Sequence, residues 1–195
     1  MARAGRVHRK TTETDVLVEL TLDGQGRSQV ETGLPFFNHM LAQIARHGLF
    51  DLTIRAKGDL EVDPHHTMED VGLALGEAFE RALGGKAGIR RYGEATVPMD
   101  DALAWVAVDL GGRPYLVYQA ERLTGKIGEF DALLLKEFFR ALATAMKANV
   151  HIGLRYGENT HHMAEAIFKA AARALGDATA LDPRVPDVPS TKGSL

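Results

Sequence analysis

The chain carries two copies of one short motif, His-His-x-x-Glu, at residues 65–69 and 161–165. In a helix, residues three or four apart lie on nearly the same face, so each motif places its glutamate beside both of its histidines. The two adjacent histidines diverge by roughly 100°, which suits them to serve two metal ions better than one. A chain that repeats this pattern is expected to contain two related halves, each with a metal-binding helix.

The sequence around the two motifs also repeats, although less closely. A Phe-Phe pair within a predicted helix precedes each motif, at residues 36–37 and 138–139, and a predicted strand follows each pair. Internal similarity on this scale indicates duplication. We therefore predict an α+β fold of two βαβ-type halves, with sheet packed on helices. The single domain, residues 1–195, would comprise pseudo-repeats at about 1–90 and 91–180 and a tail at 181–195.

Hydrophobic periodicity and turn residues locate the predicted elements. Residues 6–22 are expected to be extended, because apolar residues alternate from Val16 to Leu22. Pro64 suits the first position of a long helix, which the glycines at 84–85 would end. The other predicted helices are 34–47, 133–148 and 160–175; the other predicted strands are 50–56, 60–62, 102–110, 115–120 and 150–156; and the tail from residue 182 is predicted to be irregular.

Composition excludes several classes of protein. The net charge is −3, from 23 basic and 26 acidic side chains, whereas nucleic-acid binders usually carry a basic excess. There is no cysteine, which excludes disulfides, thiolate zinc sites and a cysteine nucleophile. No apolar run approaches the roughly 20 residues that span a bilayer, and no secretory signal begins the chain. We therefore expect a cytoplasmic protein that binds neither membrane nor nucleic acid.

Histidine and carboxylate must then hold any metal. A single His-His pair at a helix start is more often a polar surface feature, but two copies among only eight histidines favour a metal site. His39 and His151 are further candidate ligands, although each alone would pass for a solvated or core histidine. Such ligands suit zinc, manganese, iron or nickel, and the sequence does not separate these metals. The number of ligands favours a six-coordinate ion over tetrahedral zinc.

Several longer motifs support a more specific interpretation. These motifs lie at residues 36–41, 58–59, 63–70, 91–93, 98–100, 112–114, 157–169 and 189–193. Through them the chain resembles the imidazoleglycerol-phosphate dehydratase family over nearly its whole length. Asn38, where an acidic residue is expected, and Gly111, where serine is expected, depart from the family pattern without touching a candidate ligand. No phosphatase domain precedes the chain, so we expect the monofunctional form.

The resemblance implies a ribosomal protein S5 domain 2-like fold and an activity. The enzyme would dehydrate D-erythro-imidazole glycerol phosphate to imidazole acetol phosphate in L-histidine biosynthesis, with two Mn²⁺ ions per active site. It would form a homo-oligomer of 24 copies with active sites at subunit interfaces. The implied ligands of one ion are His39, His66, His162 and Glu165, and those of the other are His65, Glu69, His151 and His161.

The reaction explains why two ions would be useful. No carbonyl acidifies the carbon that loses its proton, so the imidazole ring must act as electron sink. Two cations, one at each ring nitrogen, would stabilise an imidazolate by Lewis-acid action. Glu13 is a candidate substrate contact or acid–base group by resemblance, and a metal-bound hydroxide is an equal candidate. Further candidate catalytic or substrate-binding residues are Glu69, Glu165, His39 and His47.

The phosphate group of the substrate requires cations and hydrogen-bond donors. Arginine holds phosphate through a bidentate fork, whereas lysine acts as a point charge. The tail contains Ser-Thr-Lys-Gly, which is unusual for a tail, and we predict that it orders over the phosphate. The positions that match phosphate contacts of the family are Arg91, Arg113, Lys169, Ser190, Thr191 and Lys192.

Two other functions remain open at this point. A His/Glu metal hydrolase is one, although helical zinc proteases use the order His-Glu-x-x-His. A non-enzyme whose metals only stabilise an oligomer is the other, and it predicts closed coordination spheres. A hydrolase would not need the set of arginine, lysine and serine residues that suits a phosphate, and a purely structural metal protein would have no affinity for imidazole.

Overall fold

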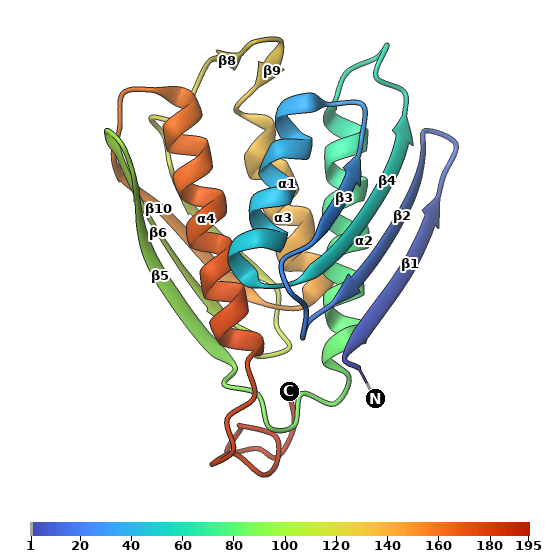
Figure 1. The fold of residues 1–195 in the computed structure, drawn as a ribbon, viewed down its shortest axis with the longest axis vertical. Coiled ribbons are helices and arrows are strands. Elements are labelled where there is room, and N and C mark those ends of the chain that lie inside the picture. The colour runs from blue at the N-terminus through green and yellow to red at the C-terminus, as the bar shows by residue number, and fades with distance from the viewer. Residues whose placement is uncertain (1) are drawn as a thin grey trace.

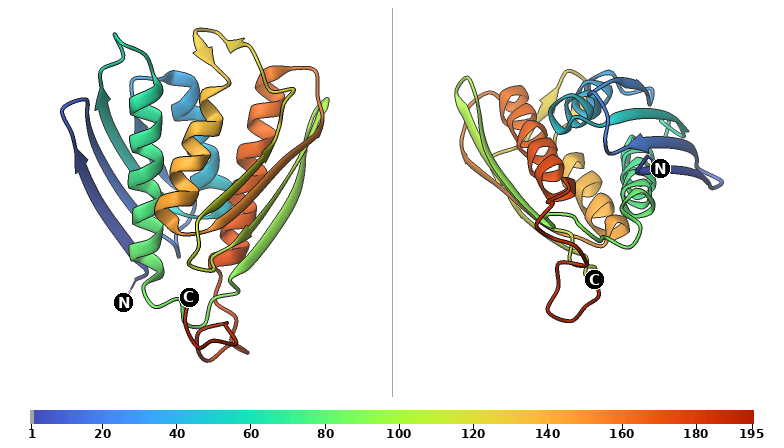
Figure 2. Two further views of the ribbon diagram at one scale, coloured as in Figure 1. Left: turned by 180° about the vertical axis from the view of Figure 1, so that it is seen from behind. Right: turned by 60° about the horizontal axis from the view of Figure 1, so that its bottom comes forward.

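Two four-stranded sheets enclose a layer of four helices (Figure 1). The computed structural model describes residues 2–195, and Met1 lies outside the described residues. The rear and tilted views in Figure 2 show the same order of layers, with the helices between the sheets and the C-terminal tail at the lower end. The helices are α1 (Pro35–Gly48), α2 (His65–Leu83), α3 (Leu134–Met146) and α4 (Thr160–Thr179).

The two sheets have the same strand order and the same pairing directions. In the first, β1-β2-β4-β3, the first three strands are antiparallel and β3 pairs in parallel with β4 across helix α1. In the second, β5-β6-β10-β7, β7 pairs in parallel with β10 across α3. The strands are β1 (Ala4–Lys10), β2 (Thr14–Thr21), β3 (Ser28–Glu31), β4 (Asp51–Gly58), β5 (Tyr92–Met99), β6 (Ala102–Asp109), β7 (Tyr115–Gln119), β8 (Lys126–Ile127), β9 (Phe130–Asp131) and β10 (Asn149–Tyr156).

This topology confirms the predicted fold class, an α+β fold of duplicated βαβ-type halves. The boundaries of the two pseudo-repeats stay a prediction. Four details differ from the sequence expectation. Residues 6–22 form two antiparallel strands, residues 60–62 form a turn, β5 and the small hairpin β8–β9 were not predicted, and α4 continues to Thr179. The turn arises because the Val62 amide donates to the Asp59 carbonyl at 2.8 Å, a bond that a strand cannot make.

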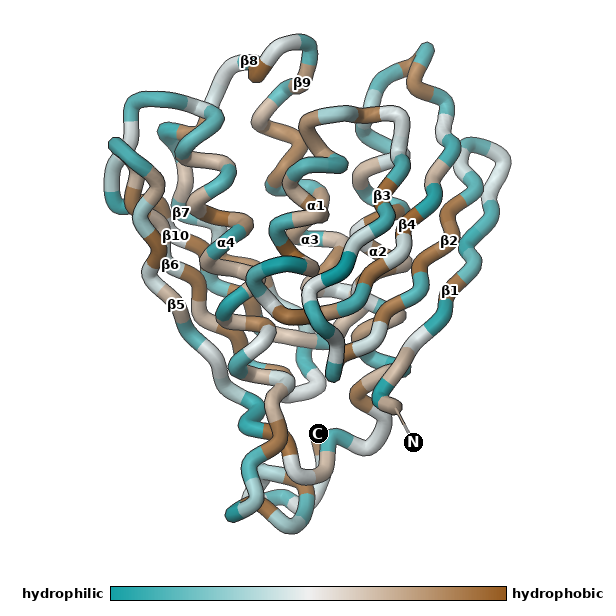
Figure 3. The backbone as a smooth tube through the Cα atoms, in the orientation of Figure 1, coloured by the Kyte–Doolittle hydropathy of each residue, from teal (hydrophilic) through white to brown (hydrophobic). Residues whose placement is uncertain are grey.

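Each sheet places an apolar face on the helices. Val16, Val18 and Leu20 of β2 are at most 2% exposed, while the residues between them are only partly buried or exposed. This alternation is typical of a sheet that packs on a core with one face and meets solvent with the other. Figure 3 shows the corresponding alternation of hydrophobic and hydrophilic residues along the strands. Within residues 2–195, no helix is both long enough and apolar enough to cross a membrane.

The helices pair across the two halves. α1 packs against α4, and α2 packs along α3, so each helix pair takes one member from each half. The Phe37 ring meets the Phe138 ring edge-on at 5.2 Å, and Phe138 stacks on Phe168 at 5.6 Å. These rings are fully buried in one continuous apolar core. The two halves therefore share their core.

A glycine in the first strand of each half allows close contact between sheet and helix. A Cβ atom on Gly5 would lie 2.1 Å from the Ala78 carbonyl oxygen of α2. A Cβ atom on Gly93 would lie 2.0 Å from the Ala174 carbonyl oxygen of α4. Both distances are far below van der Waals contact, so only glycine fits without moving the strand away from the helix.

We expect Gly93→Ala to lower the free energy of unfolding by about 1–3 kcal/mol, because the added methyl group overpacks the contact between β5 and α4. Urea denaturation followed by circular dichroism measures this change. Gly85→Ala is the control, because a Cβ atom there meets nothing within 4 Å. Equal stability of both variants would show that β5 moves away from α4 without cost.

Candidate metal centre

The second His-His-x-x-Glu motif occupies the first turns of α4. Asn159 caps this helix, and its side-chain oxygen accepts hydrogen bonds from the backbone amides of His161 at 2.9 Å and His162 at 3.3 Å. A side-chain cap satisfies amides that have no partner within the helix and fixes where the helix begins. The cap therefore sets the direction of both histidines.

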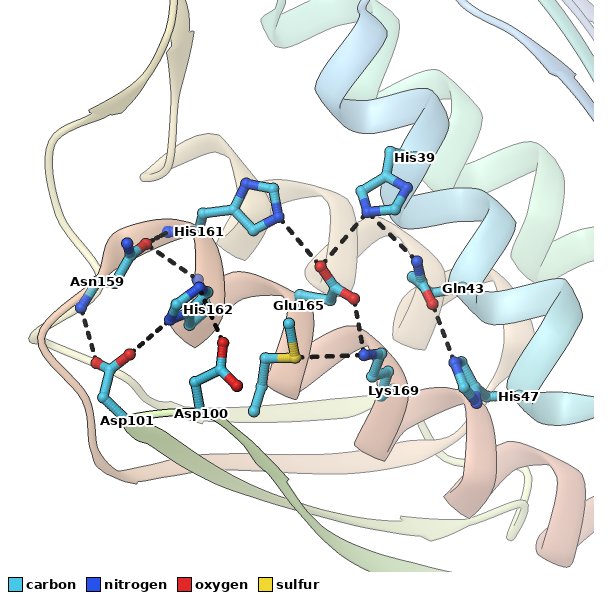
Figure 4. Close-up of polar contacts among 11 residues, drawn as sticks. His39, Gln43, His47, Asp100, Asp101, Asn159, His161, His162, Glu165 and Lys169 are labelled. Atoms are coloured by element: carbon cyan, nitrogen blue, oxygen red, sulfur yellow. Dashed lines mark hydrogen bonds and ion pairs between the residues drawn. The ribbon is translucent and has the colours of Figure 1, made fainter.

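Three side chains from two helices meet beside this turn (Figure 4). Glu165 Oε2 lies 3.1 Å from His161 Nε2 and 3.4 Å from His39 Nε2, the latter on α1. The potential ligand atoms all lie within 4.8 Å of one another. Two imidazole nitrogens and a carboxylate oxygen at this spacing fit a divalent transition metal. No other group of this kind occurs among residues 2–195.

Glu165 is ionised at this position although its side chain is only 8% exposed. Burial alone would raise the pKa of Glu165, but the hydrogen bond from Lys169 and then that from His161 outweigh burial and lower it. Lys169 Nζ lies 2.7 Å from Glu165 Oε1, one helical turn further along α4. The carboxylate is thus ready to bind a cation.

The second histidine of each motif is held by an aspartate. His66 Nδ1 lies 3.0 Å from Asp59, and His162 Nδ1 lies 2.5 Å from Asp101. In each case the hydrogen bond to the aspartate raises the pKa of the histidine. A metal-binding histidine commonly gives one ring nitrogen to a carboxylate, which orients the ring and leaves the other nitrogen for the metal. Asp59 and Asp101 occupy that position.

The first motif is less complete within one chain. His65 Nε2 and Glu69 Oε2 are 3.9 Å apart, and the Glu69 side chain is 43% exposed, in contrast to the buried Glu165. His151 lies on β10 between Val150 and Ile152, which face the core, so His151 points to the outer face of the second sheet. The chain therefore does not bring His65, Glu69 and His151 together.

Comparison with known proteins decides the family. The family model described as imidazoleglycerol-phosphate dehydratase matches residues 32–175. This chain belongs to the imidazoleglycerol-phosphate dehydratase family. The protein is therefore a dehydratase that acts in histidine biosynthesis. The family excludes the hydrolase and the non-enzymatic metal protein as alternatives.

Curated relatives and solved structures of this family match nearly the whole of this chain. The curated dehydratase of Symbiobacterium thermophilum is 61% identical over 99% of this chain and 93% of its own length. That of Frankia casuarinae is 55% identical over the whole of both chains. The crystal structure of the Staphylococcus aureus dehydratase matches with a TM-score of 0.82 and 39% identity, covering 92% of this chain and 99% of the other. The Pyrococcus furiosus enzyme, in complex with (S)-C348, matches with a TM-score of 0.79 and 37% identity, covering 97% and 100%.

A row of polar side chains along α1 leads away from the metal centre (Figure 4). The Gln43 amide nitrogen lies 3.4 Å from His39 Nε2, and the Gln43 oxygen lies 3.0 Å from His47 Nε2. Burial, and then the nearby cations Lys169 and Arg173, lower the pKa of His47. His47 is therefore neutral at neutral pH and has both a donor and an acceptor nitrogen.

The residues expected to bind the phosphate, apart from Lys169, lie at the opposite end of the folded molecule from the metal ligands. Around the C-terminal tail they line a cavity of about 670 Å³. Arg91 binds Asp109 through Nε at 2.6 Å and donates to the Pro189 carbonyl at 2.9 Å, which ties the tail to the second sheet. Lys169 is paired with Glu165 instead. The cavity brings together Arg91, Arg113, Ser190, Thr191 and Lys192.

Glu13 lies in the turn between β1 and β2, next to the first motif. Its Oε2 atom is 3.8 Å from His66 Nδ1, and its side chain is 52% exposed. The Thr11 hydroxyl accepts hydrogen bonds from the amides of Glu13 at 3.1 Å and Thr14 at 3.0 Å, which fixes the turn. Glu13 therefore presents a free carboxylate beside a candidate metal ligand.

The sequence interpretation missed the residues that support the site. Asp59 follows Gly58, and Asp101 lies in a tight turn after Met99, both within or beside stretches that resemble the family. The carboxylates next to those stretches were the available signal, but single-sequence patterns do not show which histidine an aspartate will contact. The supporting residues without an assigned role were Asp59, Asp101, Gln43, Asn159 and Asp109.

Lys169→Met tests the electrostatics of the centre in the metal-free protein. Because burial is then no longer offset by the strongest hydrogen bond, the pKa of Glu165 should rise. A carbon-13 NMR titration of the Glu165 carboxyl group measures this shift. Arg173→Met is the matched control, since it removes an exposed cation of the same helix that does not contact Glu165. An unchanged Glu165 titration in Lys169→Met would contradict the prediction.

Proposed function

We propose that this dehydratase binds two Mn²⁺ ions per active site and completes each site from more than one copy of the chain. The observation that carries the proposal is the group of His39, His161 and Glu165, which a single chain already assembles. This grouping differs from the division that the family resemblance implied, in which His161 served the other ion. We assign His161 to the same ion as His39 and Glu165, with His162 or His66 completing the ligand set.

The second ion would be held by the first motif, through His65 and Glu69, and by His151. Because His151 faces outward from the second sheet, His65 and Glu69 of another copy must approach it from outside the chain. When bound, the two ions would act as Lewis acids at the ring nitrogens and stabilise negative charge on the imidazole of the substrate. The proposed ligand set, with both nitrogen and oxygen atoms and more than four ligands, favours manganese over zinc, which is usually tetrahedral.

The residues of the chain then handle protons and orientation. Glu13 carries a half-exposed carboxylate beside His66, where it can take a proton from the second carbon of the substrate side chain. Loss of that proton, together with loss of the hydroxyl from the carbon next to the ring, gives the enol that becomes the ketone. The neutral His47 can donate to or accept from a substrate hydroxyl, and Gln43 holds it in place. Asp59 and Asp101 hold the Nδ1 atoms of the second histidines, which leaves their Nε2 atoms as the nitrogens that would bind metal. In the single chain, His162 Nε2 lies 3.4 Å from Asp100.

The phosphate would be bound by the cavity at the tail. Arg113 and Lys192 supply positive charge there, and Ser190 and Thr191 supply hydroxyl donors. Arg91 holds the tail in position through Pro189 and is itself fixed by Asp109. The tail therefore has the chemistry of a phosphate cover.

The metal ligands and the phosphate-binding cavity of one chain are too far apart to act on the same substrate molecule. Within one chain the ligand group includes His161 and Glu165 of the first turns of α4. The C-terminal tail, whose residues line the basic cavity, lies beyond the C-terminal end of the same helix (Figure 1). Helix α4 has 20 residues and is therefore about 30 Å long. A small phosphorylated imidazole cannot span that distance. A homo-oligomer would bring the cavity of one copy to the ligands of another, and the family resemblance implies an assembly of 24 copies. We propose that this assembly is cytoplasmic.

The metal requirement can be tested on the whole assembly. Protein stripped with a chelator should lose dehydration of imidazole glycerol phosphate, and added Mn²⁺ should restore it, with imidazole acetol phosphate as the readout. Activity that survives complete removal of metal would contradict the proposal. Glu19→Gln is a matched control, because the exposed Glu19 of β2 accepts a hydrogen bond from Arg6 Nε at 2.9 Å and contacts neither motif, so it should leave the Mn²⁺ response unchanged.

Complementation between inactive variants tests the shared site. His161→Ala removes a metal ligand and Arg113→Ala removes a phosphate contact, so each variant alone should be inactive. Mixed assemblies, formed by co-expression, should regain activity because some sites combine intact ligands with an intact cavity. A mixture of His39→Ala with His161→Ala should stay inactive, since one chain supplies both residues to a site. Failure of the first mixture, in assemblies shown to be mixed by mass spectrometry, would contradict sharing.

A further inference from the structure

The two halves of the chain can be aligned by strand register. Gly5 pairs with Leu20 and Lys10 pairs with Asp15, while Gly93 pairs with Val108 and Pro98 pairs with Leu103. These registers correspond one to one, and Gly5 and Gly93 make the same close contact with a helix. The turns between the paired strands therefore have equal length. Glu13 and Asp101 occupy the same position in the two turns.

A second pair of equivalent positions follows the last strand of each sheet. A Cβ atom on Gly58 would meet the side chains of Thr67 and Thr14. A Cβ atom on Gly157 would meet Met163 and Ala102, the residues at the corresponding positions. Asp59 and Glu158, which come directly after these glycines, are therefore equivalent.

The two halves use these positions in opposite ways. In the second half, Asp101 of the turn holds His162 at 2.5 Å, and Glu158 is exposed. In the first half, an Asp59 carboxylate oxygen lies 3.0 Å from His66 Nδ1, whereas the nearest carboxylate oxygen of Glu13, in the turn, lies 3.8 Å from the same atom. In each half, one of the two equivalent carboxylates hydrogen-bonds to Nδ1 of the second histidine and the other does not, and the roles are exchanged. His162 has one further carboxylate neighbour, Asp100, which lies 3.4 Å from the opposite ring nitrogen, Nε2.

We propose that Asp59 is a positioning residue that takes over the histidine contact in the first half and so frees Glu13 to act on the substrate. Without Asp59, the glutamate would be the nearest carboxylate to His66 Nδ1 and would turn toward it. Glu13 would then orient a metal ligand, as Asp101 does in the second half, and would leave the substrate. This inference rests on the proposed function, because it requires Glu13 to be used in the reaction and His66 to bind metal.

The surroundings of Glu13 allow this movement of the side chain without movement of the backbone. Thr14 donates a short hydrogen bond to the buried carboxylate of Asp70, and Arg9 Nε donates to the same carboxylate at 2.7 Å. Asp70 is only 7% exposed, so the turn is anchored to the first turns of α2. The corresponding contact in the second half is apolar, between Ala102 and the helix that contains Ala166. A fixed backbone leaves the half-exposed Glu13 side chain as the part that can rotate.

Three variants of the full assembly test the exchange: Asp59→Ala, Glu13→Gln and the double variant. Mn²⁺ affinity is measured by electron paramagnetic resonance of free Mn²⁺, and kcat is measured on imidazole glycerol phosphate. We expect Asp59→Ala to reduce kcat about tenfold or more while Mn²⁺ affinity changes less than about threefold, because Glu13 replaces the lost contact. Glu13→Gln should reduce kcat and leave Mn²⁺ affinity unchanged.

The double variant decides the question. With both carboxylates gone, Mn²⁺ affinity should fall about 10–100-fold, well beyond the product of the two single effects. Asp101→Ala is the matched comparison in the other half, and it should lower Mn²⁺ affinity on its own. Asp59→Asn, which keeps an acceptor oxygen, should restore most of the kcat lost in Asp59→Ala. Unfolding midpoints of all variants show whether the fold is intact.

The outcomes separate this inference from the proposed function. A wild-type chain that binds no Mn²⁺ would overturn both. A wild-type chain that binds Mn²⁺, together with a double variant no weaker in Mn²⁺ affinity than Asp59→Ala, would overturn the exchange alone. Wild-type kcat in Asp59→Ala would also overturn the exchange.

Discussion

The packing of α1 against α4 is the contact on which the rest of the molecule depends. These helices come from different halves of the chain, and the rings of Phe37, Phe138 and Phe168 fill the space where the halves meet. The same contact places His39 against His161 and Glu165. Formation of the core and formation of the ligand group are therefore one event, and a half that folded alone would have neither.

Duplication explains why the molecule has two motifs without having two equal sites. The strand order, the register of β1 on β2 and of β5 on β6, and the close approach of β1 and β5 to a helix repeat, whereas β10 has a register shift against β6 that β4 lacks against β2. The side chains around the motifs do not repeat. Glu165 is buried beside a lysine, whereas Glu69 is 43% exposed and pairs only loosely with His65. The second motif, together with His39 of the first half, thus forms a group of three potential ligands, and no such group forms around the first motif within residues 2–195.

Most of the helices and half of the site could be predicted from the sequence, because both depend on local patterns. Periodicity located α1 to α4, and the repeated motif located His161 and Glu165 before any fold was known. β5 was missed because Gly93 and Pro98 interrupt its pattern, and residues 60–62 were misassigned because Leu60 and Val62 alternate without forming a strand. Asp101 could not be matched to His162 across 61 residues of sequence, because that contact exists only once β5, β6 and α4 have packed. The separation of Arg113 from the ligand group is likewise a property of the folded chain.

The position of both motifs on the first turn of a helix has a consequence for the electrostatics of the reaction. The peptide dipoles of α2 and α4 add to a partial positive charge at their N-terminal ends, which favours nearby anions by about 0.3–1 kcal/mol at each end. In the proposed reaction, the two helix ends that carry the histidines would thus also favour a substrate ring that has lost a proton. The peptide backbone of the fold would contribute to stabilising that anion independently of which metal the side chains bind.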